Sequence, residues 1–144
     1  MKDKISAEDF IKAFGGNMDK KIINMKITNV SLNMKNHGIL SFDLTLEGEG
    51  YGVIYGGYCL GNGYLGSDSF KGSAAGIECL MRIMDVIGVD SWEDLNGKYC
   101  RIFTECGKTV KIIGNIIENK WFDIEAFFNE AKVNIGGKNE DSDK

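Results

Sequence analysis

An arginine between two aromatic residues is the clearest candidate for chemistry in this chain. Residues 99–104 alternate in character, so Tyr99, Arg101 and Phe103 are predicted to share one face of an extended strand. Aromatic rings beside a guanidinium suit a ligand that carries both a purine base and a phosphate. This pattern indicates binding of a small molecule more than catalysis.

A second strand is predicted directly after this one. Residues 105–108 have the character of a hairpin turn, and residues 109–117 alternate again, with Lys111 and Asn115 on one face. We therefore expect Lys111 and Asn115 to lie beside Arg101. Between residues 98 and 120 there are five cations and two carboxylates, a local balance of +3 within a chain of net charge −4. A small anionic ligand fits this balance, and so do two solvated strand faces that carry lysines for solubility.

Arg82 and Arg101 are the only arginines among seventeen basic residues. A guanidinium offers a planar fork that matches a phosphate, which a lysine does not. Each arginine also has a structural alternative. These alternatives are ion pairs, with Glu78 or Asp85 for Arg82 and with Glu105 or Glu118 for Arg101. Trp121 is open to two interpretations as well, as a core or interface residue and as a stacking partner for a base.

Residues that support catalysis or metal binding are sparse. The single histidine, His37, lies in a predicted turn, and the four cysteines have no metal-binding spacing such as CxxC. No serine or cysteine has an evident base nearby. We therefore predict that the protein is not an enzyme and uses no metal and no cofactor. Three of the thiols, those of Cys59, Cys79 and Cys100, are expected to be buried and free.

Two glycine-containing motifs do not support nucleotide chemistry. Residues 61–66 match GxGxxG, but the next predicted helix begins several residues later and no further βαβ units follow. Residues 107–109 resemble the end of a P-loop, yet Ile102 stands where that motif requires glycine. The acidic net charge disfavours binding of duplex nucleic acid. No apolar run is long enough to span a membrane and no signal peptide is evident, so a cytosolic location is expected.

Periodicity predicts one α+β domain, with an antiparallel sheet of about five strands, a main helix after the third strand and a C-terminal helix. The predicted order is a helix at 6–14, strands at 22–32, 39–47 and 51–60, a glycine-rich loop at 61–72, the main helix at 74–87, strands at 99–104 and 109–117, and a helix at 124–133. Residues 1–20 are expected to be an N-terminal helical extension, 21–135 the ligand-binding domain and 136–144 a disordered polar tail.

Several short segments resemble the first-described family of phage Thoeris anti-defence proteins, known as sponges. The resemblance covers roughly residues 26–122 and depends on the order of its pieces. These pieces are Tyr55-Gly56-Gly57-Tyr58, Gly88-Val89 with Ser91-Trp92-Glu93-Asp94-Leu95, Gly97-Lys98-Tyr99-Cys100-Arg101, Ile113-Gly114-Asn115-Ile116-Ile117 and Lys120-Trp121-Phe122. The helix at 6–14 is an addition to the usual start of the family.

The resemblance implies a protein that sequesters cyclic ADP-ribose isomers made by TIR-domain immune enzymes, in the cytoplasm of a host bacterium. Some family members also bind cyclic oligonucleotides. The ligand is expected at the interface of a homodimer, or of an assembly of dimers, without being degraded. By motif position the resemblance assigns ligand contacts to Arg101, Phe103 and Asn115, and with less support to Arg82 and Trp121. The competing hypotheses are an oligomeric protein-interaction module without a small-molecule ligand and a small enzyme that acts on nucleotides.

Overall fold

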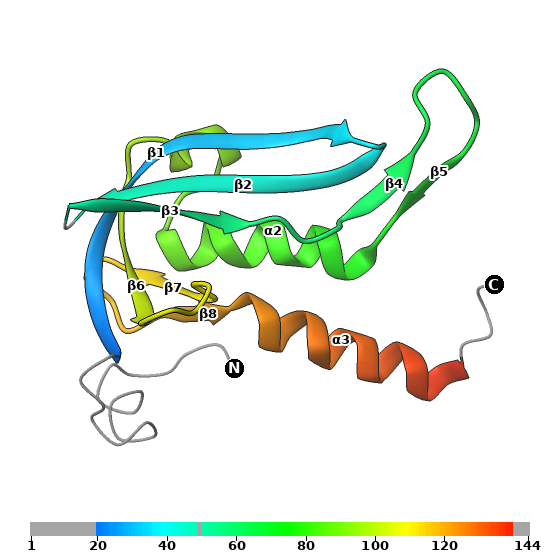
Figure 1. The fold of residues 1–144 in the computed structure, drawn as a ribbon. Helices are drawn as coiled ribbons and strands as arrows, with labels where there is room; N and C mark the ends of the chain where they lie inside the picture. Colours follow the sequence, from blue (N-terminus) through cyan, green and yellow to red (C-terminus); the bar gives the residue numbers. More distant parts are fainter. Residues whose placement is uncertain (1–19, 49, 140–144) are drawn as a thin grey trace.

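The computed structural model describes residues 20–48 and 50–139, which form one antiparallel sheet with two helices (Figure 1). The elements are β1 (Lys20–Asn36), β2 (Ile39–Gly48), β3 (Tyr51–Gly56), β4 (Gly61–Gly63), β5 (Phe70–Gly72), α2 (Ala74–Ile87), the 3-10 helix η1 (Trp92–Leu95), β6 (Tyr99–Glu105), β7 (Ile112–Asn115), β8 (Trp121–Asp123) and α3 (Ile124–Asn139). The helix predicted at 6–14 and the last residues of the predicted tail lie outside the described residues.

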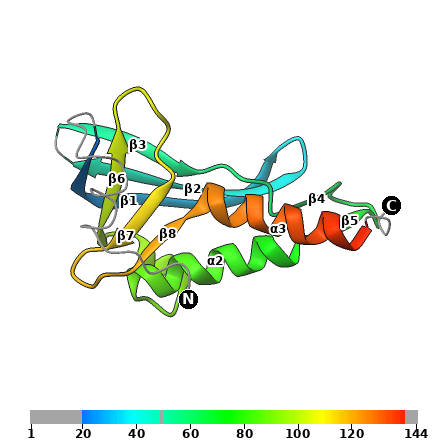
Figure 2. The ribbon, with the colours of Figure 1, turned by 90° about the horizontal axis from the view of Figure 1, so that it is seen from below.

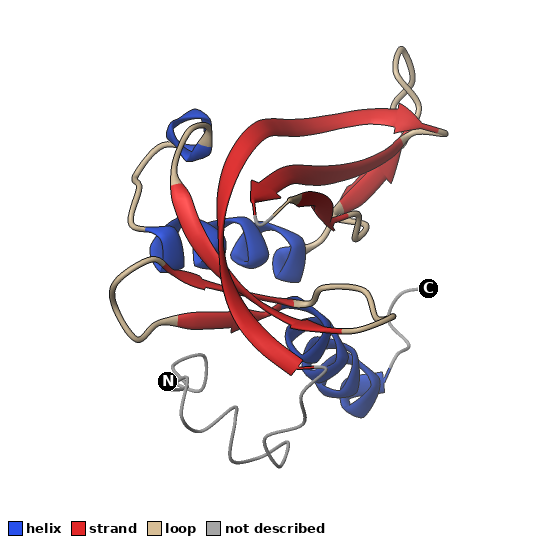
Figure 3. Ribbon diagram, turned by 60° about the vertical axis from the view of Figure 1, so that its left-hand side comes forward, coloured by secondary structure: helices blue, strands red, loops and turns tan. Residues whose placement is uncertain are grey.

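Strand β1 connects the two halves of the sheet. Its first part, Lys20–Lys26, pairs with β6, and its second part, Lys26–Asn36, pairs with β2. The strand order is β5-β4-β2-β1-β6-β7-β8, and β3 pairs with β2 off this path. Because β1 changes partner along its length, it curves strongly between the two halves (Figures 1 and 3). Helices α2 and α3 lie together on one side of the sheet (Figure 2).

The predicted α+β class and the antiparallel sheet are confirmed, but the sheet has eight strands rather than about five. The strands β4, β5 and β8 have three residues each. Strands this short, two of them with glycine at their ends, show no hydrophobic alternation from which a strand could be predicted. The segment that matches GxGxxG therefore belongs to an antiparallel hairpin, β4–β5, and the dinucleotide-binding interpretation is excluded.

Helix α2 has the predicted bounds, 74–87, and is capped at both ends. The Ser73 hydroxyl accepts a hydrogen bond from the Gly76 amide at 3.0 Å, and Gly88 ends the helix in the left-handed conformation. Helical periodicity predicts a buried stripe of Ile77, Leu80, Met81, Met84 and Ile87 in this helix. This prediction is partly wrong, because Ile77 and Met81 are 55% and 61% exposed. Gly76 is buried instead, against the connection between β3 and β4, where a Cβ atom would lie 2.8 Å from the Cα of Leu60. The helix therefore approaches this connection closely at Gly76.

The main core lies between the sheet and the helices. The concentration of aromatic residues toward the C-terminal end of the sequence would by itself favour an oligomer, since it suggests exposed aromatic surface. In the structure Trp92, Phe122, Phe127 and Phe128 pack into this core within one chain, and Trp121 is buried on the other face of the sheet. The aromatic residues therefore give no reason to expect an oligomer, which remains a proposal that rests on the resemblance.

Two further features of the described part of the chain complete the fold. Helix α3 runs to Asn139, well beyond its predicted end, and Asp123 caps it by accepting a hydrogen bond from the Ala126 amide at 2.9 Å. No helix among residues 20–48 and 50–139 has the length and apolar character needed to cross a membrane.

Candidate ligand-binding site

Arg101 lies on the face of the sheet that is turned away from α2 and α3. It stands in one row with Gly114 and Trp121, because Arg101 pairs with Gly114 and Gly114 pairs with Trp121. The guanidinium carbon lies 4.7 Å from the centre of the Trp121 ring. Its nitrogens donate to two carbonyl oxygens of the β7–β8 turn, from Nε to Asn115 at 2.7 Å and from a terminal nitrogen to Glu118 at 2.9 Å. Arg101 thus clamps the turn and packs on the indole.

Phe103 and Trp121 lie together on the same outer face. They form a small cluster with Ile22 and Ile112, here called the outer cluster. Phe103 is 7% exposed and Trp121 is 1% exposed, and the Trp121 indole N–H donates to the Asn119 side-chain oxygen at 3.0 Å. In this state neither ring offers an open face to a base.

Asn115 lies on the opposite face, beside α2. Its side-chain nitrogen donates to the carbonyl oxygens of Val86 at 2.8 Å and Ile87 at 3.3 Å, and its side-chain oxygen accepts from the amides of Ile117 and Glu118 at 2.8 and 2.7 Å. All polar atoms of this side chain therefore hold the β7–β8 turn against the end of α2.

The expectation that Lys111 and Asn115 share a face with Arg101 is wrong. Directly paired residues of an antiparallel pair point to the same side of the sheet, and the partner of Arg101 is Gly114. Asn115, the partner of Cys100, points to the helix side, and the Lys111 ammonium forms an ion pair at 2.8 Å with Glu125 of α3.

The other two predicted ligand residues lie elsewhere. Tyr99 is 56% exposed at the start of β6, with the Lys26 ammonium 5.7 Å from its ring centre. Arg82 forms an ion pair with Glu78 at 2.8 Å, and its guanidinium lies 5.7 Å from the ring centre of Phe127. The structural alternative proposed for Arg82 is therefore confirmed. Of the six predicted residues, the fold brings Arg101, Phe103 and Trp121 together.

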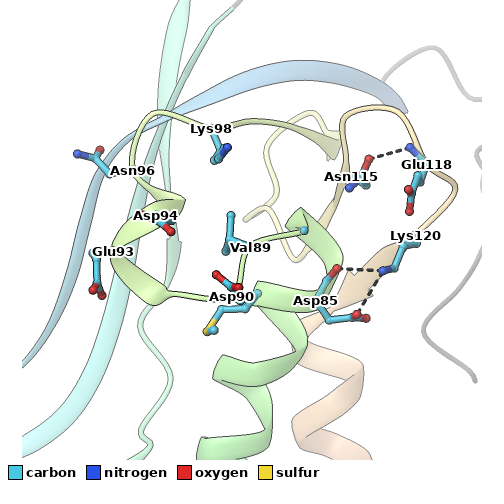
Figure 4. A pocket seen from close by; sticks show the side chains of 12 residues that line it. Asp85, Val89, Asp90, Glu93, Asp94, Asn96, Lys98, Asn115, Glu118 and Lys120 are labelled. Carbon is cyan, nitrogen blue, oxygen red and sulfur yellow. Dashed lines mark hydrogen bonds and ion pairs between the residues drawn. The ribbon is translucent and has the colours of Figure 1, made fainter.

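A cavity of about 950 Å³ opens between the end of α2, η1, the start of β6 and the β7–β8 turn (Figure 4). Its lining residues are Met84, Asp85, Gly88, Val89, Asp90, Glu93, Asp94, Asn96, Lys98, Asn115, Glu118 and Lys120. Asn115 is the one predicted ligand residue in this lining. The volume lies in the range of small-molecule sites, roughly 300–1,000 Å³.

The charges of the cavity are mixed, with five carboxylates and two ammonium groups. The Lys120 ammonium is held by Asp85, at 3.0 Å from its carbonyl oxygen and 3.2 Å from its carboxylate. The Lys98 ammonium makes no hydrogen bond or ion pair with any described residue. This site was not predicted from the sequence, because acidic residues at the start of a short helix, such as Glu93 and Asp94, are explained by the helix dipole alone. The signal lay in the charged residues of η1 and of the β7–β8 turn.

The thiols are not arranged for metal binding. Cys79 and Cys100 are buried, and burial raises the pKa of each thiol to about 12. Cys59 and Cys106 are exposed, so the expectation that Cys59 is buried is wrong. Within the described ranges no group of three or more histidine, cysteine, aspartate or glutamate side chains could hold a metal ion.

No protein-family model matches this chain, and comparisons with curated proteins and with solved structures find no match.

Proposed function

We propose that this protein binds a cyclic ADP-ribose isomer, or a related cyclic oligonucleotide, and retains it without chemical change as the sponge family does. The observation that supports the proposal is where the cavity lies. Residues from four of the five segments that carry the resemblance line it, among them Val89, Asp94, Lys98, Asn115 and Lys120. Segments that are distant in the sequence thus meet around one space of ligand size.

The lining offers both kinds of contact that such a ligand needs. The ammonium of Lys98, which has no partner among residues 20–48 and 50–139, and that of Lys120 attract the two phosphates. Carboxylates such as Asp90 and Asp94 accept hydrogen bonds from ribose hydroxyls, as acidic residues do in dinucleotide sites. The same carboxylates repel the phosphates, so they favour a ligand that presents hydroxyl groups to one side and phosphates to the other.

The rigid frame of the cavity suits retention. Asn115 and Arg101 use their polar atoms to fix the β7–β8 turn, so the backbone of Glu118 is preorganised before a ligand arrives. The cavity is open on one side, and we propose that a second copy of the chain closes it, as the homodimer implied by the resemblance requires.

Thermal unfolding with single compounds tests this function. We expect a cyclic ADP-ribose isomer to raise the melting temperature at micromolar concentration, because a ligand at about 100 times its Kd stabilises by roughly 2.7 kcal/mol. Linear ADP-ribose and AMP serve as matched controls. After washing and heat denaturation, mass spectrometry should recover the intact cyclic ligand in about one equivalent per site. Conversion to linear ADP-ribose would instead show an enzyme, and no shift with any cyclic nucleotide would refute the proposal.

The second candidate is the protein-interaction module, and the β4–β5 hairpin favours it. This hairpin exposes three large apolar side chains, Tyr64 at 70%, Leu65 at 80% and Phe70 at 55%. Exposed apolar groups that cluster on a projecting hairpin are typical of a contact surface. A triple substitution of these residues by serine should leave nucleotide binding unchanged if the first proposal holds. A loss of biological activity with nucleotide binding retained would favour the second.

A further inference from the structure

One ion pair at the wall of the cavity joins the β7–β8 turn to the end of α2. The Lys120 ammonium donates to the backbone carbonyl oxygen of Asp85 at 3.0 Å and to the Asp85 carboxylate at 3.2 Å (Figure 4). The Lys120 side chain is 21% exposed, whereas that of Asp85 is 60% exposed. The cation is therefore sheltered by the fold, and the carboxylate that meets it lies largely in solvent.

The two contacts of Lys120 differ in how easily they can be broken. The carbonyl oxygen belongs to the last turn of α2, where backbone carbonyls have no partner within the helix and where the helix dipole favours a cation. The next two carbonyls, of Val86 and Ile87, accept hydrogen bonds from Asn115 at the end of β7. The backbone contact thus fixes the ammonium in place. The carboxylate contact is a partly exposed ion pair, which contributes little to stability and is lost when one side chain rotates away.

The Asp85 carboxylate takes the position at Lys120 that a phosphate group of a ligand would take. Carboxylate and phosphate oxygens are both anionic acceptors, and they contact an ammonium at similar distances. The other ammonium of the lining, that of Lys98, has no hydrogen bond or ion pair with any residue of the ranges 20–48 and 50–139. Among the described residues, then, Lys98 is open to an anion while Lys120 is already occupied.

We propose that Asp85 is a specificity-determining residue, because its carboxylate competes within the chain for the same ammonium as a ligand phosphate. A free anion of single charge gains little at Lys120, since it exchanges one anionic partner for another and leaves the freed carboxylate nearby. A ligand held at Lys98 through one phosphate presents its second phosphate at high effective concentration, and this group displaces the carboxylate. The cavity thus favours ligands with two linked phosphate groups over monophosphates.

This role of Asp85 rests on the proposed function in one respect, namely that Lys98 and Lys120 contact phosphates. Inorganic pyrophosphate has two linked phosphates and neither base nor ribose, so it probes the two cations apart from the rest of a nucleotide. The parent chain should bind pyrophosphate about tenfold or more tightly than inorganic phosphate.

Titration calorimetry of the full chain with pyrophosphate measures the competition. Asp85→Asn keeps the shape of the side chain and the backbone contact but weakens the hold on Lys120, so it should raise the affinity about fivefold or more. Asp90→Asn is the matched control, because Asp90 lines the same cavity and makes no ion pair with any described residue. It removes the same charge and should raise the affinity about twofold at most. Equal gains in the two variants would overturn the proposal.

A double-mutant cycle assigns the gain to Lys120. Lys120→Gln removes the charge and keeps a donor for the Asp85 carbonyl oxygen, so the turn should stay attached to α2. In this background Asp85→Asn should raise the affinity for pyrophosphate no more than Asp90→Asn does, since no ammonium is released. A fivefold gain that persists without the lysine charge would show general repulsion by Asp85 and would also overturn the proposal.

The outcomes separate this role of Asp85 from the proposed function. If a cyclic ADP-ribose isomer binds to no variant while pyrophosphate shows the gain that depends on Lys120, the nucleotide function fails and the role of Asp85 stands. If the isomer binds and pyrophosphate affinity is the same in Asp85→Asn and Asp90→Asn, the function stands and the role of Asp85 is refuted. A chain that binds no pyrophosphate in any variant, or binds inorganic phosphate as tightly as pyrophosphate, refutes it as well.

Discussion

The Arg101 guanidinium lies 4.7 Å from the centre of the Trp121 ring, and Gly114 stands between their two strands. The missing side chain at Gly114 lets the indole lie flat on β7, where a Cβ atom would collide with the ring. The residue that the sequence pattern assigns to a ligand therefore acts first as a clamp of the β7–β8 turn.

Arg101→Ala should lower the free energy of unfolding by about 1–3 kcal/mol, since it removes two charge-assisted hydrogen bonds and the packing on Trp121. Urea denaturation measures this loss. Arg82→Ala is the matched control and should cost less than about 1 kcal/mol, because its ion pair with Glu78 is a partly exposed helical pair. An Arg101→Ala variant of parental stability would mean that the clamp is not formed in solution.

Gly114→Ala should destabilise the protein by about 1–3 kcal/mol, because the added methyl group forces Trp121 off β7. Thermal unfolding followed by circular dichroism gives the comparison. The control is Gly72→Ala, at a position where a Cβ atom meets nothing within 4 Å and where φ is not positive. If the two variants have the same melting temperature, Trp121 does not lie over Gly114.

The fold class was predictable because its signals are local. Ser73 and Gly88 cap α2 as their residue types predict, and the alternation of β2 places Phe42, Leu44 and Leu46 in the core. The rotation of α2 was not predictable, because the close approach of Gly76 to Leu60 depends on a residue in the connection between β3 and β4. The strands β4, β5 and β8 could not be predicted from hydrophobic periodicity, because each has only three residues.

The site was harder to predict than the fold. Alternation of residue types along a strand predicts which face of the sheet a side chain lies on, but not how deeply it is buried or which residue it contacts. Tyr99, Arg101 and Phe103 do share one face of β6, as predicted, yet they range from 56% exposed at Tyr99 to 7% at Phe103. The register of β6 and β7 decides that Gly114, rather than Asn115, stands next to Arg101. No property of either strand by itself encodes that register.

Removing a positive charge and removing a negative charge from the cavity lining should have different effects on ligand affinity. Lys98→Ala should weaken binding of a cyclic ADP-ribose isomer about tenfold or more, since it removes a charge-assisted phosphate contact. Asp90→Asn should strengthen binding or leave it unchanged, because it removes repulsion and keeps a hydrogen-bonding group. Titration calorimetry measures both. Lys71→Ala, on β5 and outside the cavity lining, is the control for a general effect of net charge.

The buried thiols make stability sensitive to high pH. Burial raises the pKa of Cys79 and Cys100 from the ordinary value of 9.0 to about 12. The unfolded chain releases these protons near pH 9 while the folded chain keeps them. The free energy of unfolding should therefore be unaffected by these groups below pH 9 and fall above it, by about 1.4 kcal/mol per pH unit for each thiol.

Denaturation at several pH values up to about pH 11 measures this slope, and Cys79→Ala should reduce it by the share of one thiol. Alkylation with iodoacetamide at pH 8 gives an independent check. Cys59 and Cys106 are exposed and should be modified in the native protein, whereas Cys79 and Cys100 should react only after denaturation. Rapid modification of Cys100 would contradict the burial from which the pH dependence follows.

Strand β1 pairs with both β2 and β6, and this affects how the chain folds during synthesis. The half of β1 that pairs with β2 meets its partner within a short hairpin, whereas Lys20–Lys26 must wait for β6, about eighty residues later in synthesis. At about 5–20 residues per second, this strand half stays without its neighbour for several seconds. During that interval an edge of β1 is open to nascent copies of the same chain and to chaperones. The number of codons between these two strands therefore sets how long this edge lacks its partner during synthesis.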